Sequence, residues 1–329
     1  MIGFGGIAAG LGEDPLMAQA FAYPTHASVL AKHPAFSWEA VVDLSDKALE
    51  QASENWQIPI CVRDVEELAS RYDPEIAVIT IPSDLRLAEL NHLKSLRAVI
   101  AEKPLGMKLM HAEQFVQTCE QRNLVVQVNY WRRGAVGLRD LAASLFSHTG
   151  RPQAAFATYG GGLFNNGSHI IDFVRMLLGE VISVQAYGPP CALDNPALKG
   201  DVHIPFLLCL ECGANVFVAP LEYENYREVG LDIWGERGRL TLFQETLLGR
   251  HYPIAENRGL TGEREIATDA GAAVDTRVSN ALYDLYDNLA ANLSIGADLW
   301  SSGSSALQSE AVVDAVLRSA ECRQSVALH

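Results

Sequence analysis

Short runs of β-branched and apolar residues alternate with amphipathic stretches through the first 130 residues of the chain. The runs have the length and composition of buried strands, and the stretches between them have the apolar spacing of helices. Because parallel strands need crossover connections, this alternation predicts a parallel sheet with helices on both faces. The strand candidates are residues 39–45, 75–82, 97–104 and 124–130, and the helix candidates are residues 46–56, 64–72, 84–94 and 110–123.

The second half of the chain has a different pattern, in which strand candidates follow one another with short turns and few helices between them. This pattern predicts a mostly antiparallel sheet in a second domain, so that the chain as a whole is of the α/β class. The change of pattern gives expected domains at residues 1–121 and 122–329. The later strand candidates are residues 153–159, 181–188, 204–211, 214–223, 228–235 and 238–245, followed by an amphipathic segment at residues 305–323.

Composition and charge narrow the class of protein. With 329 residues, 49% of them hydrophobic and 20% charged, the chain can form two domains with substantial cores. The formal net charge of −15, with no basic stretch to offset it, argues against a nucleic-acid partner. No apolar run reaches the roughly 20 residues that a membrane helix needs, and the N-terminus lacks the pattern of a signal peptide. We therefore expect a cytoplasmic enzyme without a membrane partner.

Six cysteines in a chain of this length do not indicate a disulfide framework. Cys209 and Cys212 form a C-x-x-C inside an apolar run, with no second pair nearby. We interpret them as core or strand-face residues and predict no metal site.

The chain opens with MIGFGGIAAG, which fits the G-x-G-x-x-G/A pattern of a dinucleotide-binding turn. Such a turn follows a strand, yet only two residues precede the first glycine. We therefore expect a stunted first strand of about two to four residues, and a natural N-terminus a few residues upstream of Met1. The residues predicted to contact the cofactor in this turn are Gly3, Gly5, Gly6, Ile7 and Ala8.

An acidic residue, Asp43, ends the next predicted strand. In this place an acid can accept the hydroxyls of an adenosine ribose and repel a 2′-phosphate, so it favours NAD over NADP. The separation of Gly3 from Asp43 is about twice the usual one. We assign the excess to residues 12–26, as a loop and an extended first helix. The alternative is a surface acid that closes a strand, but the glycines and the alternation favour cofactor binding.

A second group of candidates lies where later strands end. The strand in AVIAEKPLG ends at Glu102–Lys103, at the carboxyl edge where ligands bind in open α/β sheets. A lysine there can hydrogen-bond a substrate hydroxyl and stabilise a developing alkoxide. The alternative for these two residues is a surface ion pair of little energetic weight. We expect Glu102, Lys103, Ile81 and Pro82 to border the cofactor.

The stretch GGGLFNNGSHIIDFVRMLLGE carries a third group. Ser168 is expected to cap a helix that ends at Gly179 and is apolar nearly all round. Asn165, His169 and Asp172 share one face if the turn continues helically. Polar groups on a buried helix need partners, and the glycine-rich approach leaves room for a ligand. A lone histidine is more often structural, but His169 alone among nine lies in such a row.

These motifs, in this order, resemble those of the Gfo/Idh/MocA oxidoreductases, named for glucose-fructose oxidoreductase and inositol dehydrogenase. The residues that carry the resemblance are the glycine turn, Asp43, Glu102–Lys103–Pro104, GSHIID and DIWGERGRL, and it extends over almost the whole chain. The resemblance implies a Rossmann domain followed by a domain with a large open sheet. That second domain would hold the substrate and often forms a homodimer or homotetramer. The implied reaction is nicotinamide-dependent oxidation or reduction of a sugar, cyclitol or sugar nucleotide.

By the same resemblance, Lys103 and His169 match the family's catalytic lysine and histidine. The family's aspartate four residues before that histidine is Asn165 here, and an amide cannot act as a carboxylate. Asp172 could supply the missing charge or simply hold the helix. A family histidine in P-x-x-x-H is Arg86 here, at a position peripheral to the chemistry.

The leading hypothesis is that His169 takes the hydroxyl proton as general base while Lys103 holds the oxygen. Substrate contacts are expected at Asn129, Tyr130 and Arg132, and Arg132 or Arg133 would suit a phosphate, although either could be a solvated surface charge. Two alternatives are a non-catalytic dinucleotide-binding regulator of the same fold and a reductase of a non-sugar substrate. The substrate and the direction of the reaction do not follow from the sequence.

Overall fold

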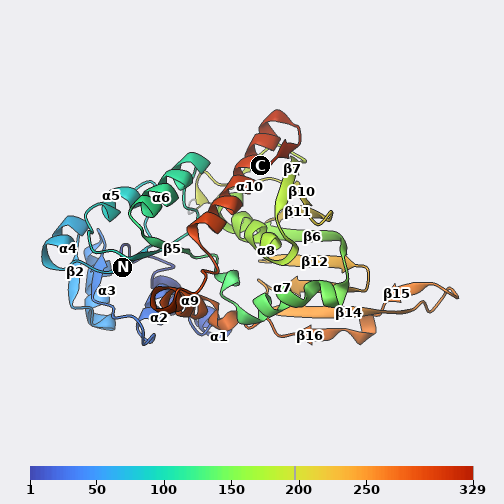
Figure 1. The fold of residues 1–329 in the computed structure, drawn as a ribbon, viewed down its shortest axis with the longest axis horizontal. Coiled ribbons are helices and arrows are strands. Elements are labelled where there is room, and N and C mark those ends of the chain that lie inside the picture. Colours follow the sequence, from blue (N-terminus) through green and yellow to red (C-terminus); the bar gives the residue numbers. More distant parts are fainter. Residues whose placement is uncertain (196–197, 329) are drawn as a thin grey trace. The chain divides into compact units, whose positions relative to one another are not determined.

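The computed structural model describes residues 1–195 and 198–328. The chain forms two compact units, Met1–Ala135 with Ser279–Gln308 and Val136–Val278 with Ser309–His329. The chain passes from the first unit to the second after Ala135 and again after Gln308, and the second of these points lies within helix α10 (Gly303–Cys322), which Figure 1 labels. Each unit therefore combines segments that are distant in the sequence.

The first unit contains a parallel sheet. Its strands are β1 (Ala40–Val42), β2 (Ile60–Val62), β3 (Ile76–Ile79), β4 (Ala98–Ala101) and β5 (Val125–Val128). β1 pairs with β2, β3 with β4, and β4 with β5, all in parallel. Ile2 joins the two groups, because it bridges to Val42 on one side and to Ile79 on the other. The order β2, β1, residues 1–3, β3, β4, β5 is the Rossmann order. β5 follows residue 122 and belongs to this unit.

The first three residues supply the central connection of this sheet. The N–H of Ile2 donates to the carbonyl of Val78 at 2.8 Å, and the N–H of Gly3 donates to that of Val42 at 2.8 Å. The ammonium group of Met1 donates to the carbonyl of Ala40 at 2.7 Å. Burial lowers the pKa of this amino group to about 5.

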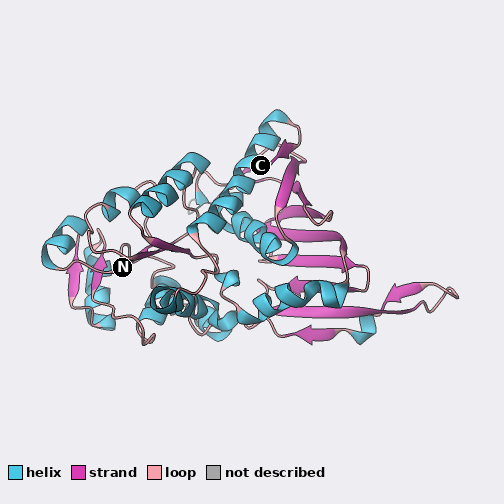
Figure 2. Ribbon diagram, viewed as in Figure 1, coloured by secondary structure: helices cyan, strands magenta, loops and turns pink. Residues whose placement is uncertain are grey.

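Helices cover both faces of the parallel sheet, as the alternation predicted (Figure 2). Val99 and Ala101 of β4 pack in a cluster with α4, α5 and α6, whereas Ala98 and Ile100 pack in one with α2, α3 and α9. Alternate residues of a strand point to opposite faces, which accounts for this division. The helices are α1 (Pro15–Ala20), α2 (His26–Leu30), α3 (Asp46–Trp56), α4 (Val65–Arg71), α5 (Arg86–Leu90), α6 (Leu109–Gln121) and α9 (Ala281–Ile295), with 3-10 turns at η1 (Gly10–Glu13), η2 (Trp131–Arg133) and η6 (Val278–Asn280).

The second unit contains a ten-stranded sheet with the order β15-β14-β13-β12-β6-β11-β10-β7-β17, in which β16 also pairs with β14. Neighbouring strands are antiparallel except β6 and β11, so the prediction of a mostly antiparallel sheet is confirmed. The strands are β6 (Pro152–Gly160), β7 (Val181–Ala186), β10 (Phe206–Leu210), β11 (Asn215–Leu221), β12 (Gly230–Gly235), β13 (Gly238–Phe243), β14 (Leu248–Glu256), β15 (Arg264–Ile266), β16 (Ala272–Val274) and β17 (Val326–Ala327), with β8 (Cys191–Ala192) and β9 (Val202–His203) in a separate pair.

Helices α7 (Val136–Thr149) and α8 (Ser168–Leu178) pack against each other and against this sheet, with α7 on β13 and α8 on β6. The 3-10 turn η5 (Thr268–Ala270) lies between β15 and β16. The side chains of Phe156 on β6 and Phe217 on β11 are 44% and 47% exposed and stand at paired positions. Their neighbours Ala155 and Val216 are buried, so the sheet has one covered face and one face with exposed aromatic side chains.

Candidate active site

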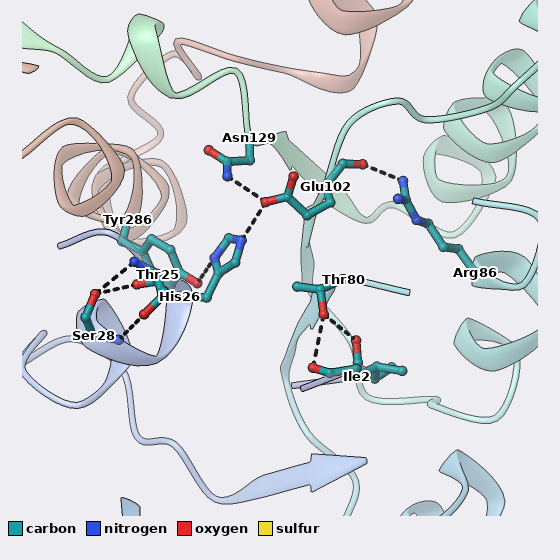
Figure 3. A network of polar contacts seen from close by, with 10 residues as sticks. Ile2, Thr25, His26, Ser28, Thr80, Arg86, Glu102, Asn129 and Tyr286 are labelled. Carbon is teal, nitrogen blue, oxygen red and sulfur yellow. Dashed lines mark hydrogen bonds and ion pairs between the residues drawn. The ribbon is translucent and has the colours of Figure 1, made fainter. Parts of the chain in front are cut away.

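The glycine turn follows the central connection of the parallel sheet. Gly3 has a φ of 89°, and a Cβ added there would lie 2.6 Å from Oγ1 of Thr80. That hydroxyl donates to the carbonyls of Ile2 and Gly3, at 3.2 and 3.0 Å (Figure 3). A Cβ at Gly5 or Gly6 would meet no atom within 4 Å. The turn is therefore closed toward β3 and open on its other side, an arrangement that fits a dinucleotide pyrophosphate.

The helix that leaves this turn is interrupted and then resumed. The N–H of Ala9 donates to the carbonyl of Gly5, but residues 6–9 form only turns, and the 3-10 turn η1 that follows them ends at Glu13. The N–H groups of His26 and Ala27 then donate to the carbonyls of Ile7 and Ala8, at 3.2 and 2.8 Å. The extra residues lie where we expected them, but they form short separate turns rather than an extended first helix. A capping box of Thr25 and Ser28 restarts the helix at α2.

Asp43 lies directly after β1, against the glycine turn. Its Oδ2 accepts the N–H of Phe4 at 2.7 Å, and its Oδ1 accepts that of Ser45 at 2.8 Å. An ionised carboxylate offers about four acceptor positions, so two bonds leave capacity for ribose hydroxyls. The geometry suits the predicted contact with the cofactor.

The end of β4 presents Glu102 and Lys103, with Glu102 only 8% exposed. Oε1 of Glu102 accepts hydrogen bonds from Nε2 of His26 at 2.9 Å and from Nδ2 of Asn129 at 2.6 Å (Figure 3). Burial acts to raise the pKa of Glu102, but the bond and charge of His26, then the bond from Asn129 and the charge of Lys103, hold it below its ordinary value. Glu102 is thus an ionised carboxylate inside the domain rather than half of a surface pair.

Arg86 fixes the turn that bears Lys103. Its side chain is 3% exposed, and its guanidinium donates to the carbonyls of Ile81 at 3.0 Å, of Pro104 at 2.9 Å and of Glu102. A buried guanidinium needs several acceptors, and carbonyls at the ends of β3 and β4 supply them. The sequence indicated a peripheral position for Arg86, and only these contacts show that it holds the turn. They also place Ile81 beside the turn.

The three residues expected to contact substrate follow β5. Asn129, Tyr130 and Arg132 are 3%, 1% and 3% exposed. Asn129 is turned toward Glu102, and Tyr130 belongs to the core cluster on the α4–α6 face. The guanidinium carbon of Arg132 lies 4.3 Å from the ring centroid of Trp131. Arg132 is therefore not a solvated surface charge.

The other candidate residues lie in the second unit, at the start of α8. A π-helical turn, η3 (Leu163–Gly167), precedes α8, so Asn165 does not continue the α-helical phase of His169. Ser168 does not cap the helix as expected. It lies within α8, and its hydroxyl donates to the carbonyls of Phe164 and Asn165, at 2.8 and 3.0 Å. The helix ends at Leu178 before Gly179, whose φ is 97°, as expected.

The side chain of Asp201, which is distant in the sequence, binds the backbone of the π-helical turn. Its Oδ1 accepts the N–H of Phe164 at 3.0 Å, and its Oδ2 accepts that of Asn165 at 2.9 Å. A Cβ at Gly162 would lie 2.1 Å from this carboxylate, so only glycine allows the approach. The carboxylate satisfies N–H groups at the start of a helical segment, where negative charge is favourable. Sequence reasoning missed Asp201, because it follows Asn165 by 36 residues with no local motif.

His169 and Asp172 are both buried in α8, at 9% and 2% exposure. Oδ1 of Asp172 accepts the hydroxyl of Ser309 at 2.9 Å and lies 3.7 Å from Nη1 of Arg175. Asp172 was expected either to supply the charge that Asn165 lacks or to hold the helix, and these contacts suit the second role.

Two family models match the chain. Residues 17–130 match the oxidoreductase family with an NAD-binding Rossmann fold, and residues 146–328 match the C-terminal alpha/beta domain of the same family. The first match begins after the glycine turn. No helix in the described part of the chain is long and apolar enough to cross a membrane.

Individual proteins are similar over most of the chain. A D-apiose dehydrogenase of Rhizobium rhizogenes is 25% identical over 271 residues, which are 73% of this chain and 75% of that protein. An oxidoreductase of Agrobacterium radiobacter, solved with NAD+, L-tartaric acid and magnesium, has a TM-score of 0.71 at 20% identity, with 91% and 95% of the two chains covered. The WlbA dehydrogenase of Bordetella pertussis, solved with NADH and UDP-GlcNAcA, has a TM-score of 0.71 at 20% identity, with 92% and 94% covered.

Proposed function

The chain belongs to the Gfo/Idh/MocA family of oxidoreductases, and we propose that it transfers a hydride between NAD and a secondary hydroxyl or carbonyl of a sugar, cyclitol or sugar nucleotide. The observation that carries this proposal is the turn bearing Lys103, which Arg86 and the buried Glu102 fix at the carboxyl edge of the NAD-binding sheet. Two similar proteins, a D-apiose dehydrogenase and a dehydrogenase solved with a nucleotide sugar, support the substrate class.

In this proposal the protein orients the reactants, and NAD supplies the hydride chemistry. The backbone of the glycine turn and the carboxylate of Asp43 hold the dinucleotide. Lys103 donates a hydrogen bond to the reacting oxygen and stabilises negative charge on it. His169 takes the proton of the hydroxyl, and Asn165 orients the substrate or the imidazole by hydrogen bonding.

The experiment is a turnover assay on the purified protein with NAD or NADP and a panel of inositols, aldoses and nucleotide sugars, followed by the absorbance of reduced nicotinamide. Dihydrodiols belong in the panel, because a non-sugar substrate is the nearest enzymatic alternative. We expect NAD-dependent turnover of at least one sugar-type compound.

A dinucleotide-binding regulator without catalysis is the second candidate, and Asn165 in place of the family's aspartate favours it. That function predicts NAD binding without turnover on any compound. In a regulator neither Lys103 nor His169 has a catalytic role. Turnover that depends on Lys103 excludes it.

A further inference from the structure

The buried side chains of Tyr286, His26 and Glu102 form a continuous hydrogen-bonded chain that ends one residue before Lys103. His26 on α2 and Tyr286 on α9 are both 0% exposed. Nδ1 of His26 lies 2.7 Å from the hydroxyl of Tyr286, and its Nε2 lies 2.9 Å from Oε1 of Glu102 (Figure 3). The reaction proposed above uses neither His26 nor Tyr286.

The carboxylate fixes the direction of one of these hydrogen bonds. An ionised carboxylate only accepts, so Nε2 of His26 carries the proton that points to Glu102. The hydroxyl of Tyr286 contacts the other ring nitrogen, Nδ1, and holds the ring in this orientation. Burial, followed by the charge of Glu102, raises the pKa of Tyr286 well above its usual value, so the phenol stays a donor.

The charge on Glu102 depends on these neighbours. Burial, the largest influence, raises its pKa, and the interactions of His26 are the largest that oppose it. The side chains that face the carboxylate of Glu102 are His26 from α2, Asn129 after β5 and Lys103 from its own turn, with Tyr286 behind His26. Arg86 of α5 donates to the backbone carbonyl of Glu102. Asn129 is neutral and makes a single bond. Without His26, burial would favour the neutral acid.

We propose that His26, oriented by Tyr286, is a positioning residue that keeps Glu102 ionised and thereby keeps the amine of Lys103 in its ammonium form. The ammonium form is the one that can donate to a substrate oxygen and stabilise an alkoxide. The inference rests on the role proposed for Lys103, but it concerns a property of the resting protein that exists without substrate.

Competitive acetylation tests it directly. The protein is treated with a trace of acetic anhydride at a series of pH values, and mass spectrometry of peptides gives the extent of reaction at each lysine. The exposed Lys47 and Lys108 serve as internal references. In Glu102→Gln, which keeps an acceptor for His26, we expect the midpoint of the Lys103 profile to fall by about one pH unit, a roughly tenfold gain in reactivity below the midpoint.

The decisive comparison is with His26. His26→Leu should shift the Lys103 profile about as far as Glu102→Gln, and the double variant should shift it no further, because both act through one carboxylate. His26→Gln, whose side-chain amide can still donate to Glu102, should restore most of the wild-type profile. A wild-type profile in His26→Leu, or shifts that add in the double variant, would overturn the proposal.

Two controls separate this test from a failure to fold and from a failure of the proposed function. If His26→Leu does not fold, Tyr286→Phe replaces it, since this change removes one hydroxyl. We then expect a smaller shift in the same direction, and an unchanged Lys103 profile counts against the proposal. Acetylation needs no substrate and no turnover, so failure of the proposed dehydrogenase function leaves this result unaffected.

Discussion

Asp43 is the residue that should decide which nicotinamide cofactor binds. Its carboxylate lies against the glycine turn, where a 2′-phosphate would meet its negative charge. We expect calorimetry to give a lower dissociation constant for NAD than for NADP, and Asp43→Ser to narrow the difference. Asp46→Ser, at an exposed position on α3, is the matched control and should change neither value. Tighter binding of NADP by the wild-type protein is the result that would contradict this assignment.

Lys103 and His169 are the residues on which turnover should depend. Lys103→Ala or His169→Ala is expected to lower kcat by about two orders of magnitude or more, the usual scale for one acid–base or charge-stabilising group. The affinity for NAD, measured by calorimetry, should persist in both. Lys108→Ala, at an exposed lysine near the same turn, is the control. Native turnover in either variant would refute its assigned role.

At the scale of elements, the π-helical turn η3 depends on a carboxylate that is distant in the sequence. Asp201→Asn replaces an acceptor of backbone N–H groups by an amide that must place a donor against one of them. We expect a loss of about 1–3 kcal/mol in the free energy of unfolding by urea, and a lower kcat because Asn165 lies in this turn and His169 follows it. Asp194→Asn, at an exposed position, should leave both values unchanged. If Asp201→Asn matches the wild type in kcat, the turn does not position these residues.

Helix α9 carries the half-buried Asp284 one turn before Asp287, and the raised pKa of Asp284 makes stability depend on pH. Burial, and then the charge of Asp287, raises the pKa of Asp284 to about 6. The folded state therefore binds a proton more tightly than the unfolded chain, whose aspartate has a pKa of about 3.9. Stability from this group is present at low pH and is lost as pH rises from about 4 to about 6.

Asp284→Asn should remove the loss of stability that follows ionisation of Asp284. At pH 8 we expect a gain of about 1 kcal/mol, allowing for screening by solvent at this half-buried side chain, and a rise in Tm of about 2 °C. Near pH 4 most of the gain should be gone, because the aspartic acid is then neutral in the folded state and about half protonated in the unfolded chain. Thermal unfolding of the variant and the wild type at the two pH values measures this gain in stability. An equal gain at both pH values would show that the charge of Asp284 is not its cause.

At the scale of the whole molecule, the exposed face of the ten-stranded sheet should form the contact between copies of the chain. Phe156 and Phe217 stand side by side on β6 and β11, and burial of such exposed aromatic side chains favours association. We expect a homodimer or homotetramer by light scattering, and a smaller species for Phe217→Glu. Phe146→Glu, at a similarly exposed phenylalanine on α7, is the control and should leave the mass unchanged. A wild-type monomer would contradict the expectation.

The sequence predicts the elements of this chain only where a pattern within a short stretch of residues reveals them. The alternation of strands and helices predicted β1, β3, β4 and β5 with their helices, because period and composition within a short window reflect burial. Helix α9 was not among the candidates, although it covers one face of the first sheet. Strands β14 to β16 were missed as well, because they are short or only partly buried and lack a strong apolar run.

The candidate site divides in the same way. The sequence alone determined the glycine turn, the acid after β1, Glu102 and Lys103 after β4, and the end of α8 at Gly179, since each depends on a few adjacent residues. Only the tertiary structure decided the partners of His26, which bonds Glu102 across 76 residues of sequence and Tyr286 across 260. It also decided that Arg86 holds the turn of Lys103 and that Asp201 holds the turn of Asn165. Buried polar groups take whichever partner the folded chain brings near, and that choice leaves no periodic pattern in the sequence.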